Sequence, residues 1–359
     1  MLKNYFMVKT KEFEIEKKAE IALRTCLERV PFLKIESLQK EFSVDDFCAD
    51  FLVTLVLFDS KQNLVIEVKN NGQPRVARDA VNKLLRYRNT YPDFYGVFMA
   101  PYISPQSAEI CSKDGIGYID LAGNCRLFFG RVYIEQTGNP NPFREKRDLR
   151  SLYSPKAARI LRVLLINPKR VWKTQDMAKE AEVSLGQVAN VKKFLDDREW
   201  ILVTAEGFSL REPEKLLKEW SENYTFKKNQ MRNFYSLKNS VEVEEDLARV
   251  CNERGIKYAL TGFSGAVRFA PAVRYQRAMA YVSDNFEEVA SVLNLKEVPS
   301  GANVTLLTPY DEGVFYGTRL VGGIRVASPV QIYLDLVSFR GRGEEAAHVL
   351  LEEVIKPTW

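Results

Sequence analysis

Residues 154–210 carry the pattern that most restricts how this chain can fold: three short apolar-periodic stretches, then two strand-like runs. Ser154 and Pro155 begin the first stretch favourably, because serine caps a helix N-terminus and proline fits its first turn. Its apolar residues then fall on one face: Ile160, Leu161, Val163, Leu164 and Leu165. The segment therefore opens with a predicted amphipathic helix.

Two further helices are expected after this one. Thr174 is a natural N-cap for a short helix over Gln175–Ala181. Ser184 and Gln187 have the spacing of a capping box, which predicts a third helix over about Leu185–Arg198. Apolar residues at spacings of three and four give this third helix a buried face: Val188, Val191 and Leu195.

Two strand-like runs, Trp200–Thr204 and Phe208–Leu210, follow the third helix and are joined by Ala205–Gly207. They form a plausible hairpin. Three helices and a hairpin in this order predict a winged helix-turn-helix, whose third helix enters the major groove of DNA.

The exposed side chains of this segment suit that role. Gln187 and Asn190 can pair bidentately with adenine edges, and Lys193 can reach guanine or phosphate. The candidate DNA-binding residues are Lys169, Arg170, Lys173, Thr174, Ser184, Gln187, Asn190, Lys192 and Lys193. We expect double-stranded DNA as the partner, with no cofactor required. A winged helix that docks on another protein is the alternative.

The charge distribution agrees with DNA binding. Between Phe143 and Lys193, thirteen lysines and arginines stand against five acidic residues, a local excess of +8. The whole chain carries +5, which leaves −3 for the remainder. A basic block on a slightly acidic chain resembles an electrostatic footprint for phosphate, the alternative being a solvated basic surface. The block begins at Arg144–Arg150, so we expect the footprint to include this linker.

Composition excludes several classes of function. His348 is the only histidine, and the five cysteines form no CxxC pair, which argues against zinc fingers, disulfide frameworks and histidine-based acid–base enzymes. No apolar run is long enough to span a membrane, and the charged segment Lys9–Lys18 argues against a signal peptide. We therefore expect a cytoplasmic protein without a membrane partner. The 359 residues predict two or three domains.

The N-terminal segment predicts a mixed sheet flanked by helices. The predicted helices are Lys11–Arg29, Arg75–Thr90 and Pro105–Lys113. The predicted strands are Asp50–Phe58, Leu64–Lys69, Tyr95–Ala100, Gly117–Asp120 and Arg126–Phe129.

Three charged residues stand at apolar strands of this segment. Asp50 begins one strand, and Glu67 and Lys69 lie two apart on its hairpin partner, so they share a face. Charges inside an apolar run are locally disfavoured and often mark a site. Two carboxylates can hold Mg²⁺, and a lysine can polarise the attacking water. Together these groups can catalyse phosphodiester hydrolysis.

Asp50 followed by Glu67-Val68-Lys69 on a hairpin between helices resembles the D…ExK core of the restriction-endonuclease-like nucleases, over about residues 10–130. The resemblance implies a Mg²⁺-dependent endonuclease. Asp50 and Glu67 would be the metal ligands, and Lys69 would act on the scissile phosphate. The alternative is an inherited fold in which Glu67 and Lys69 form a partly buried ion pair.

The run Tyr258–Ala266, a strand that ends in a small-residue turn, resembles the nucleotidyltransferase-like fold. That family places metal-binding carboxylates shortly after the turn. Ala266–Pro271 and the next strand, Ala278–Val282, contain none, so the fold is expected to be degenerate and without nucleotidyl transfer.

Together with Val330–Leu336, the helix opening at Gly341–Ala347 and the central winged helix, this arrangement resembles the AbiEi antitoxins of type IV toxin–antitoxin systems, best over residues 150–359. The resemblance implies a DNA-binding transcriptional regulator whose partner is a toxin of nucleotidyltransferase fold. This chain departs from the short family form, because a nuclease-like domain precedes the winged helix.

The sequence thus predicts a multidomain α/β protein. Residues 1–140 form a restriction-endonuclease-like domain, 150–215 the winged helix-turn-helix, and 225–359 the nucleotidyltransferase-like domain. The turn-rich Thr137–Pro142 and the charged, aromatic Glu219–Lys238 are the expected boundaries. We expect a DNA-binding regulator, with the Mg²⁺-dependent nuclease as the alternative.

Overall fold

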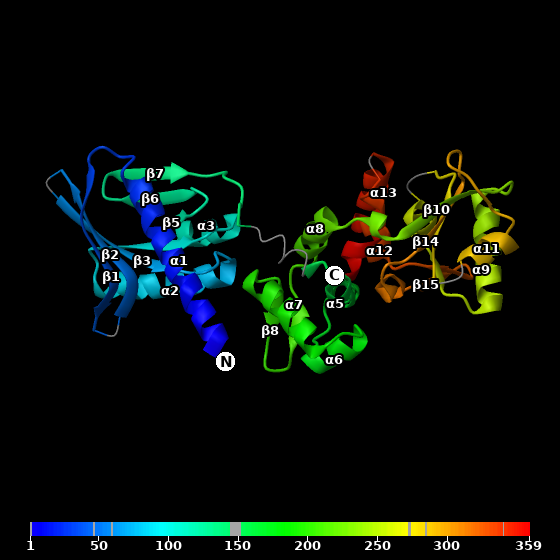
Figure 1. The fold of residues 1–359 in the computed structure, drawn as a ribbon, viewed down its shortest axis with the longest axis horizontal. Helices are drawn as coiled ribbons and strands as arrows, with labels where there is room; N and C mark the ends of the chain where they lie inside the picture. The colour runs from blue at the N-terminus through cyan, green and yellow to red at the C-terminus, as the bar shows by residue number, and fades with distance from the viewer. Residues whose placement is uncertain are drawn as a thin grey trace. The chain divides into compact units, whose positions relative to one another are not determined.

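The computed structural model describes residues 2–45, 47–58, 60–143, 152–271, 274–283, 286–339 and 341–359, with side chains from Glu14 onward. Within these residues it is a mixed α/β protein with two seven-stranded sheets and one two-stranded hairpin (Figure 1). The chain folds into two compact units, Met1–Glu145 with Asp197–Glu199, and Lys146–Asp196 with Trp200–Trp359. No helix among the described residues is long and apolar enough to cross a membrane.

The first unit is one sheet in which the strands follow chain order from β1 to β7. Its strands are β1 (Leu33–Val44), β2 (Phe47–Leu57), β3 (Ser60–Val68), β4 (Phe94–Ala100), β5 (Gly117–Asp120), β6 (Cys125–Phe129) and β7 (Val132–Gln136). Strands β3, β4 and β5 are parallel, and the remaining neighbours are antiparallel. The expected mixed sheet is therefore present.

Helices cover both faces of this sheet (Figure 1). The helices are α1 (Leu2–Leu27), α2 (Pro74–Thr90) and α3 (Pro105–Lys113). Alternation along the strands sends Phe51, Val53 and Leu55 into the core beneath α1, whereas Val65 and Phe98 pack with α2 and α3. Two buried layers thus hold β3 and β4 from both sides.

The second unit begins with three helices and a hairpin. These are α5 (Pro155–Ile166), α6 (Thr174–Glu180), α7 (Leu185–Asp197), β8 (Ile201–Val203) and β9 (Phe208–Leu210), followed by α8 (Pro213–Asn223). The first three helices and the hairpin lie where the sequence predicted them, with one correction, whereas α8 was not predicted. Thr174 is not the cap of α6: the N-cap is Lys173, and its side chain makes no capping hydrogen bond.

The second seven-stranded sheet has the order β13-β10-β14-β12-β11-β16-β15. Its strands are β10 (Gln230–Tyr235), β11 (Tyr258–Leu260), β12 (Ala278–Val282), β13 (Lys296–Glu297), β14 (Val304–Thr308), β15 (Arg319–Val321) and β16 (Ile324–Val326). Its helices are α9 (Ser240–Arg254), α10 (Gly262–Ala266), α11 (Phe286–Val292), α12 (Pro329–Leu336) and α13 (Arg342–Leu350). Short helical turns lie at η1 (Phe226–Lys228) and η2 (Glu312–Phe315), and η3 (Leu351–Ile355) and η4 (Lys356–Thr358) end the chain.

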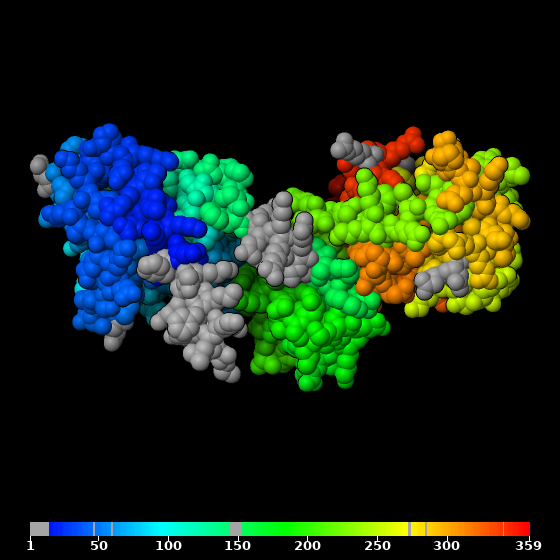
Figure 2. All heavy atoms as spheres, in the orientation of Figure 1, coloured from blue at the N-terminus to red at the C-terminus, as the bar shows by residue number. Residues whose placement is uncertain are grey.

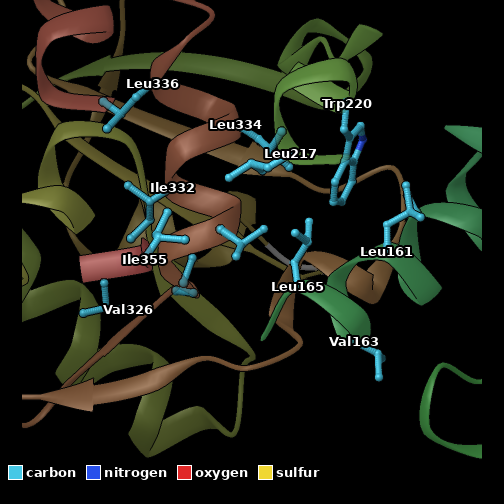
Figure 3. Close-up of a cluster of buried hydrophobic side chains, with 14 of the residues drawn as sticks. Leu161, Val163, Leu165, Leu217, Trp220, Val326, Ile332, Leu334, Leu336 and Ile355 are labelled. Atoms are coloured by element: carbon cyan, nitrogen blue, oxygen red, sulfur yellow. The ribbon is translucent and has the colours of Figure 1, made fainter. Parts of the chain in front are cut away.

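One continuous hydrophobic core joins the three-helix part to this second sheet (Figure 3). Leu161 and Leu165 of α5, Trp220 of α8, and Ile332 and Leu334 of α12 lie in it. The expected boundary at Glu219–Lys238 contains the end of α8, η1 and β10 rather than an unstructured linker. The division of this unit into two domains therefore stays a prediction.

Buried polar groups tie the same elements together. Arg162 of α5 is 1% exposed and donates from Nε and Nη2 to Oε1 of Gln331 on α12, at 3.0 and 2.6 Å. Its guanidinium also lies over the Trp220 ring, 5.1 Å from the centroid. Because an unpaired buried guanidinium is very unfavourable, these contacts fix how α5 sits on α12.

Candidate functional site

The exposed face of α7 carries the polar side chains of the candidate DNA interface. Val188, Val191 and Leu195 are buried beneath α7, which leaves Asn190 and Lys193 exposed on the other side. The Ser184 hydroxyl accepts a hydrogen bond from the Gln187 backbone N–H at 3.2 Å, the capping contact that the sequence predicted. α7 thus begins at a fixed point and presents an amide and an ammonium group to solvent.

The remaining candidates fall into two groups. Lys169, Arg170 and Lys173 are exposed in the turn before α6, where Arg170 lies over the Trp172 ring at 3.8 Å. Lys192 is half-buried on α7, with its ammonium 5.3 Å from the centroid of the Phe208 ring. These contacts place Arg170 against Trp172 and Lys192 against Phe208 of the hairpin. The surface of this segment is drawn in green in Figure 2.

A hollow of about 710 Å³ lies at the N-terminus of α7. Gln187 and Ser184 line it, together with Lys156 of α5 and Lys179 of α6. These two lysines could not be predicted from the sequence, because their approach to α7 depends on how the three helices pack. Glu182 also lines the hollow and is paired with Arg159 at 2.8 Å. The basic linker Arg144–Arg150 lies outside the described residues.

In the first unit, the structure brings Asp50, Glu67 and Lys69 together. The antiparallel register that pairs Phe51 with Ile66 brings Asp50 and Glu67 opposite each other. The Val68 backbone N–H donates to Oδ2 of Asp50 at 2.6 Å. The Lys69 ammonium is paired with Oε1 of Glu67, whose side chain is 1% exposed.

Two residues of α2 complete this site and were missed by the sequence analysis. Lys83 places Nζ 2.7 Å from Oε2 of Glu67, so each oxygen of that carboxylate holds one lysine. Tyr87, one turn further along α2, is 1% exposed, and its hydroxyl has no hydrogen-bond partner among the described residues. Their spacing of four on the amphipathic α2 was the available signal, because it puts both on one helix face.

Burial and charge perturb the acids of this site. Burial is the main reason that the pKa of Asp50 is raised, with the nearby Glu67 adding to it, while the hydrogen bond from Val68 opposes the shift. Burial, followed by the negative charge of Glu67, also raises the pKa of Tyr87. These groups are therefore close enough to sense one another's charge.

The donor set fits Mg²⁺ in kind, because Mg²⁺ takes one or two carboxylates and keeps several waters. Asp50 and Glu67 are such a pair, and no group of three or more His, Cys, Asp or Glu side chains suited to a metal occurs in the part of the chain that the structure describes. The unpartnered Tyr87 hydroxyl can hydrogen-bond a further ligand there. A metal ion at Glu67 would have to displace Lys69 or Lys83, whose side chains are 36% and 34% exposed.

The small-residue turn in the second unit is closely packed. Gly262 has φ of +53°, and a Cβ there would lie 2.6 Å from the Met279 sulfur. A carboxylate near this turn is Asp335 of α12, which is fully buried and accepts from Thr261 at 2.5 Å and from Tyr224 at 2.6 Å. This carboxylate is therefore buried and hydrogen-bonded within the protein.

Comparison with known proteins connects the C-terminal part with one family. Residues 209–356 match the family described as the transcriptional regulator AbiEi antitoxin of type IV toxin–antitoxin systems. The resemblance that the sequence predicted over residues 150–359 is thus confirmed over this part, which is less than half of the chain. No curated protein matches the sequence.

Among solved structures, the chain has a weak similarity to repair endonucleases. A repair endonuclease from Pyrococcus abyssi is 15% identical with a TM-score of 0.22, covering 28% of this chain and 46% of that one. EndoMS bound to double-stranded DNA is 18% identical with a TM-score of 0.22, covering 28% and 43%. EndoMS without DNA is 19% identical with a TM-score of 0.21, covering 29% and 45%. The chain therefore spans less than half the length of each of these proteins.

Proposed function

We propose that this protein is a DNA-binding transcriptional regulator of the AbiEi antitoxin type, and that residues 155–210 are a winged helix. The exposed polar face of α7 carries the proposal: Asn190 and Lys193 project from a helix whose start is fixed by the Ser184 cap. The family match of residues 209–356 supports it independently. In this proposal α7 lies in the major groove of duplex DNA.

The proposed contacts divide by chemistry. Gln187 and Asn190 read base edges through their amides, and Lys193 reaches guanine or phosphate. Lys169, Arg170, Lys173 and Lys192 contact phosphates and set the register without reading sequence. Thr174 and Ser184 lie beside them, at the starts of α6 and α7.

Fluorescence anisotropy on labelled duplex DNA over a series of salt concentrations tests this proposal. Lys193→Ala should weaken binding and lower the slope of log affinity against log salt by about 1, since one phosphate neutralisation is lost. Lys296→Ala, an exposed lysine of β13, is the matched control and should change neither. Equal slopes for wild type and Lys193→Ala would refute the placement of α7.

Residues 225–359 form, in this proposal, a nucleotidyltransferase-like domain without metal carboxylates, which binds a cognate toxin of nucleotidyltransferase fold. The close packing at Gly262 and the buried hydrogen bond that Asp335 accepts from Thr261 support a binding role rather than catalysis. Co-expression with a nucleotidyltransferase encoded beside this gene, followed by size-exclusion chromatography, tests it. Separate elution of the two proteins would contradict it.

The second candidate function is a Mg²⁺-dependent endonuclease, favoured by the convergence of Asp50, Glu67, Lys69 and Lys83. Asp50 and Glu67 would hold the metal, which supplies Lewis-acid polarisation of the phosphate when bound. Lys69 would then be released from Glu67 and bind the scissile phosphate, and Lys83 would stabilise the developing negative charge.

Plasmid DNA incubated with the purified protein and Mg²⁺ or Mn²⁺ tests the nuclease. Cleavage that Lys69→Ala abolishes would establish it. The control is Lys61→Ala on β3, where the lysine is exposed and paired with Glu36 at 2.6 Å. DNA binding without cleavage in the wild type would leave the regulator as the function of the chain.

A further inference from the structure

Two cysteines far apart in sequence meet in the first unit. Cys26 lies at the end of α1 and Cys125 begins β6, and both belong to the core between α1 and the sheet. Their side chains are 5% and 2% exposed, and the two thiols lie close enough that each shifts the pKa of the other. Apolar side chains could fill this core equally well, so the presence of two buried thiols in one cluster needs a chemical explanation.

A cavity of about 460 Å³ opens onto this pair. Both cysteines line it, together with Lys18 of α1, Arg29 in the turn after α1, and the carboxylate of Asp120. The cavity can admit a small polar molecule, and the cations favour the thiolate form of a nearby sulfur. The Asp120 carboxylate is already occupied by the protein. Its oxygens accept hydrogen bonds from three backbone N–H groups and from the Asn124 side chain.

The pKa values of the two thiols are shifted in opposite directions. The hydrogen bond from Cys26 is the main cause that lowers the pKa of Cys125, and Arg29 lowers it further against the effect of burial. The same hydrogen bond and burial raise the pKa of Cys26. By contrast, burial raises the pKa of Cys111 and of Cys251 to about 12, which keeps these thiols unreactive.

We propose that Cys26 and Cys125 are a redox-modification site, oxidised by a hydroperoxide to an intrachain disulfide that fastens α1 to β6. No group of three metal-binding side chains occurs within the described residues, so the proposal invokes no metal there. The burial of both thiols in one core and the cavity that both of them line carry the proposal.

The chemistry balances with hydrogen peroxide as the oxidant. The Cys125 thiolate attacks one peroxide oxygen, an S–O bond forms, the O–O bond breaks, and the released hydroxide takes a proton to become water. The Cys26 sulfur then attacks the sulfur of the resulting sulfenic acid. An S–S bond forms, the S–O bond breaks, and a second water leaves with the Cys26 proton. Two thiols are oxidised while one peroxide is reduced to two waters.

The test uses the full chain with Cys48→Ser, because Cys48 is the exposed cysteine and would react first. The protein is treated with hydrogen peroxide, denatured, alkylated and digested without reduction, and the peptides are identified by mass spectrometry. We expect a linked peptide pair that contains Cys26 and Cys125, the loss of two of four alkylatable thiols, and reversal by dithiothreitol. Alkylation of all four thiols, at a peroxide concentration that oxidises Cys48 in the wild type, would overturn the proposal.

A second variant separates the two steps. With Cys26→Ser added, Cys125 has no partner, so its sulfenic acid should accumulate and be trapped by dimedone. With Cys125→Ser added instead, Cys26 should remain fully alkylatable, as Cys111 and Cys251 do in every variant. Oxidation of Cys26 without Cys125 would contradict the assigned roles.

Discussion

The double ion pair on Glu67 makes a quantitative prediction about the first unit. Lys69 and Lys83 share one carboxylate that is 1% exposed, while each lysine keeps about a third of its side chain in solvent. Lys69→Met or Lys83→Met leaves Glu67 with one remaining partner, so each change should destabilise the unit by only about 1 kcal/mol. Removing both lysines leaves a buried carboxylate without a cation, which costs about 3–5 kcal/mol.

The two substitutions should therefore not be additive. The double variant should lose about 1–3 kcal/mol more than the sum of the single variants, the coupling expected of residues that share one partner. Adding Glu67→Gln to the double variant removes the buried charge and should restore most of the loss. This rescue separates an uncompensated charge from simple loss of packing.

The assay must report on the first unit alone. All four tryptophans lie at Trp172 or later, so tryptophan fluorescence follows the second unit only. Hydrogen exchange of peptides from β3 and β4, measured by mass spectrometry under native conditions, gives the local unfolding free energy. Additive losses, or a triple variant no more stable than the double one, would refute the shared-carboxylate reasoning.

Three further predictions concern other parts of the chain. Asp335→Ala leaves several buried donors without an acceptor, among them Thr261 and Tyr224. It should destabilise the second unit by about 3–5 kcal/mol, measured by urea unfolding followed through tryptophan fluorescence. Asp335→Asn should cost less, and equal losses for the two variants would contradict this. Asp50 has a raised pKa in the folded state, so its contribution to stability is present below its ordinary pKa of 3.8 and is lost as the pH rises through the folded value. Asp50→Asn should remove this pH dependence, and hydrogen exchange of β3 that keeps the wild-type pH profile would disprove it. Gly207→Ala would put a Cβ 2.4 Å from the Trp172 carbonyl oxygen, so it should lower the melting temperature and weaken DNA binding; an unchanged melting temperature would count against the hairpin geometry.

The local sequence pattern was sufficient to predict most of the helices and strands. The apolar runs at Leu64–Lys69 and Tyr95–Ala100 are strands because they are buried from both faces, and such runs are legible without tertiary information. In the first unit, the strands β1 (Leu33–Val44) and β7 (Val132–Gln136) were not predicted. β1 is a mostly exposed edge strand with polar residues on both faces, so it has no apolar periodicity to detect.

The candidate site was predictable only in part. The proximity of Asp50, Glu67 and Lys69 could be predicted from the sequence. The three residues belong to one hairpin, and the register of a hairpin determines which residues lie opposite each other. Lys83 and Tyr87 come from a helix, and their approach to Glu67 depends on how α2 packs on the sheet. Thr174 failed as a cap because helix α6 begins one residue earlier than its sequence pattern indicates, at a boundary that propensity alone rarely fixes.

The central claim is that α7 reads duplex DNA, and base discrimination tests it most directly. Duplexes selected from a random pool by the wild-type protein would be compared with scrambled duplexes of the same composition. The account predicts that Asn190→Ala lowers the ratio of the two affinities about 10-fold, because one bidentate amide contact is worth about 1–3 kcal/mol, while affinity for scrambled DNA stays the same. An unchanged ratio, or selection that enriches no sequence, would contradict it.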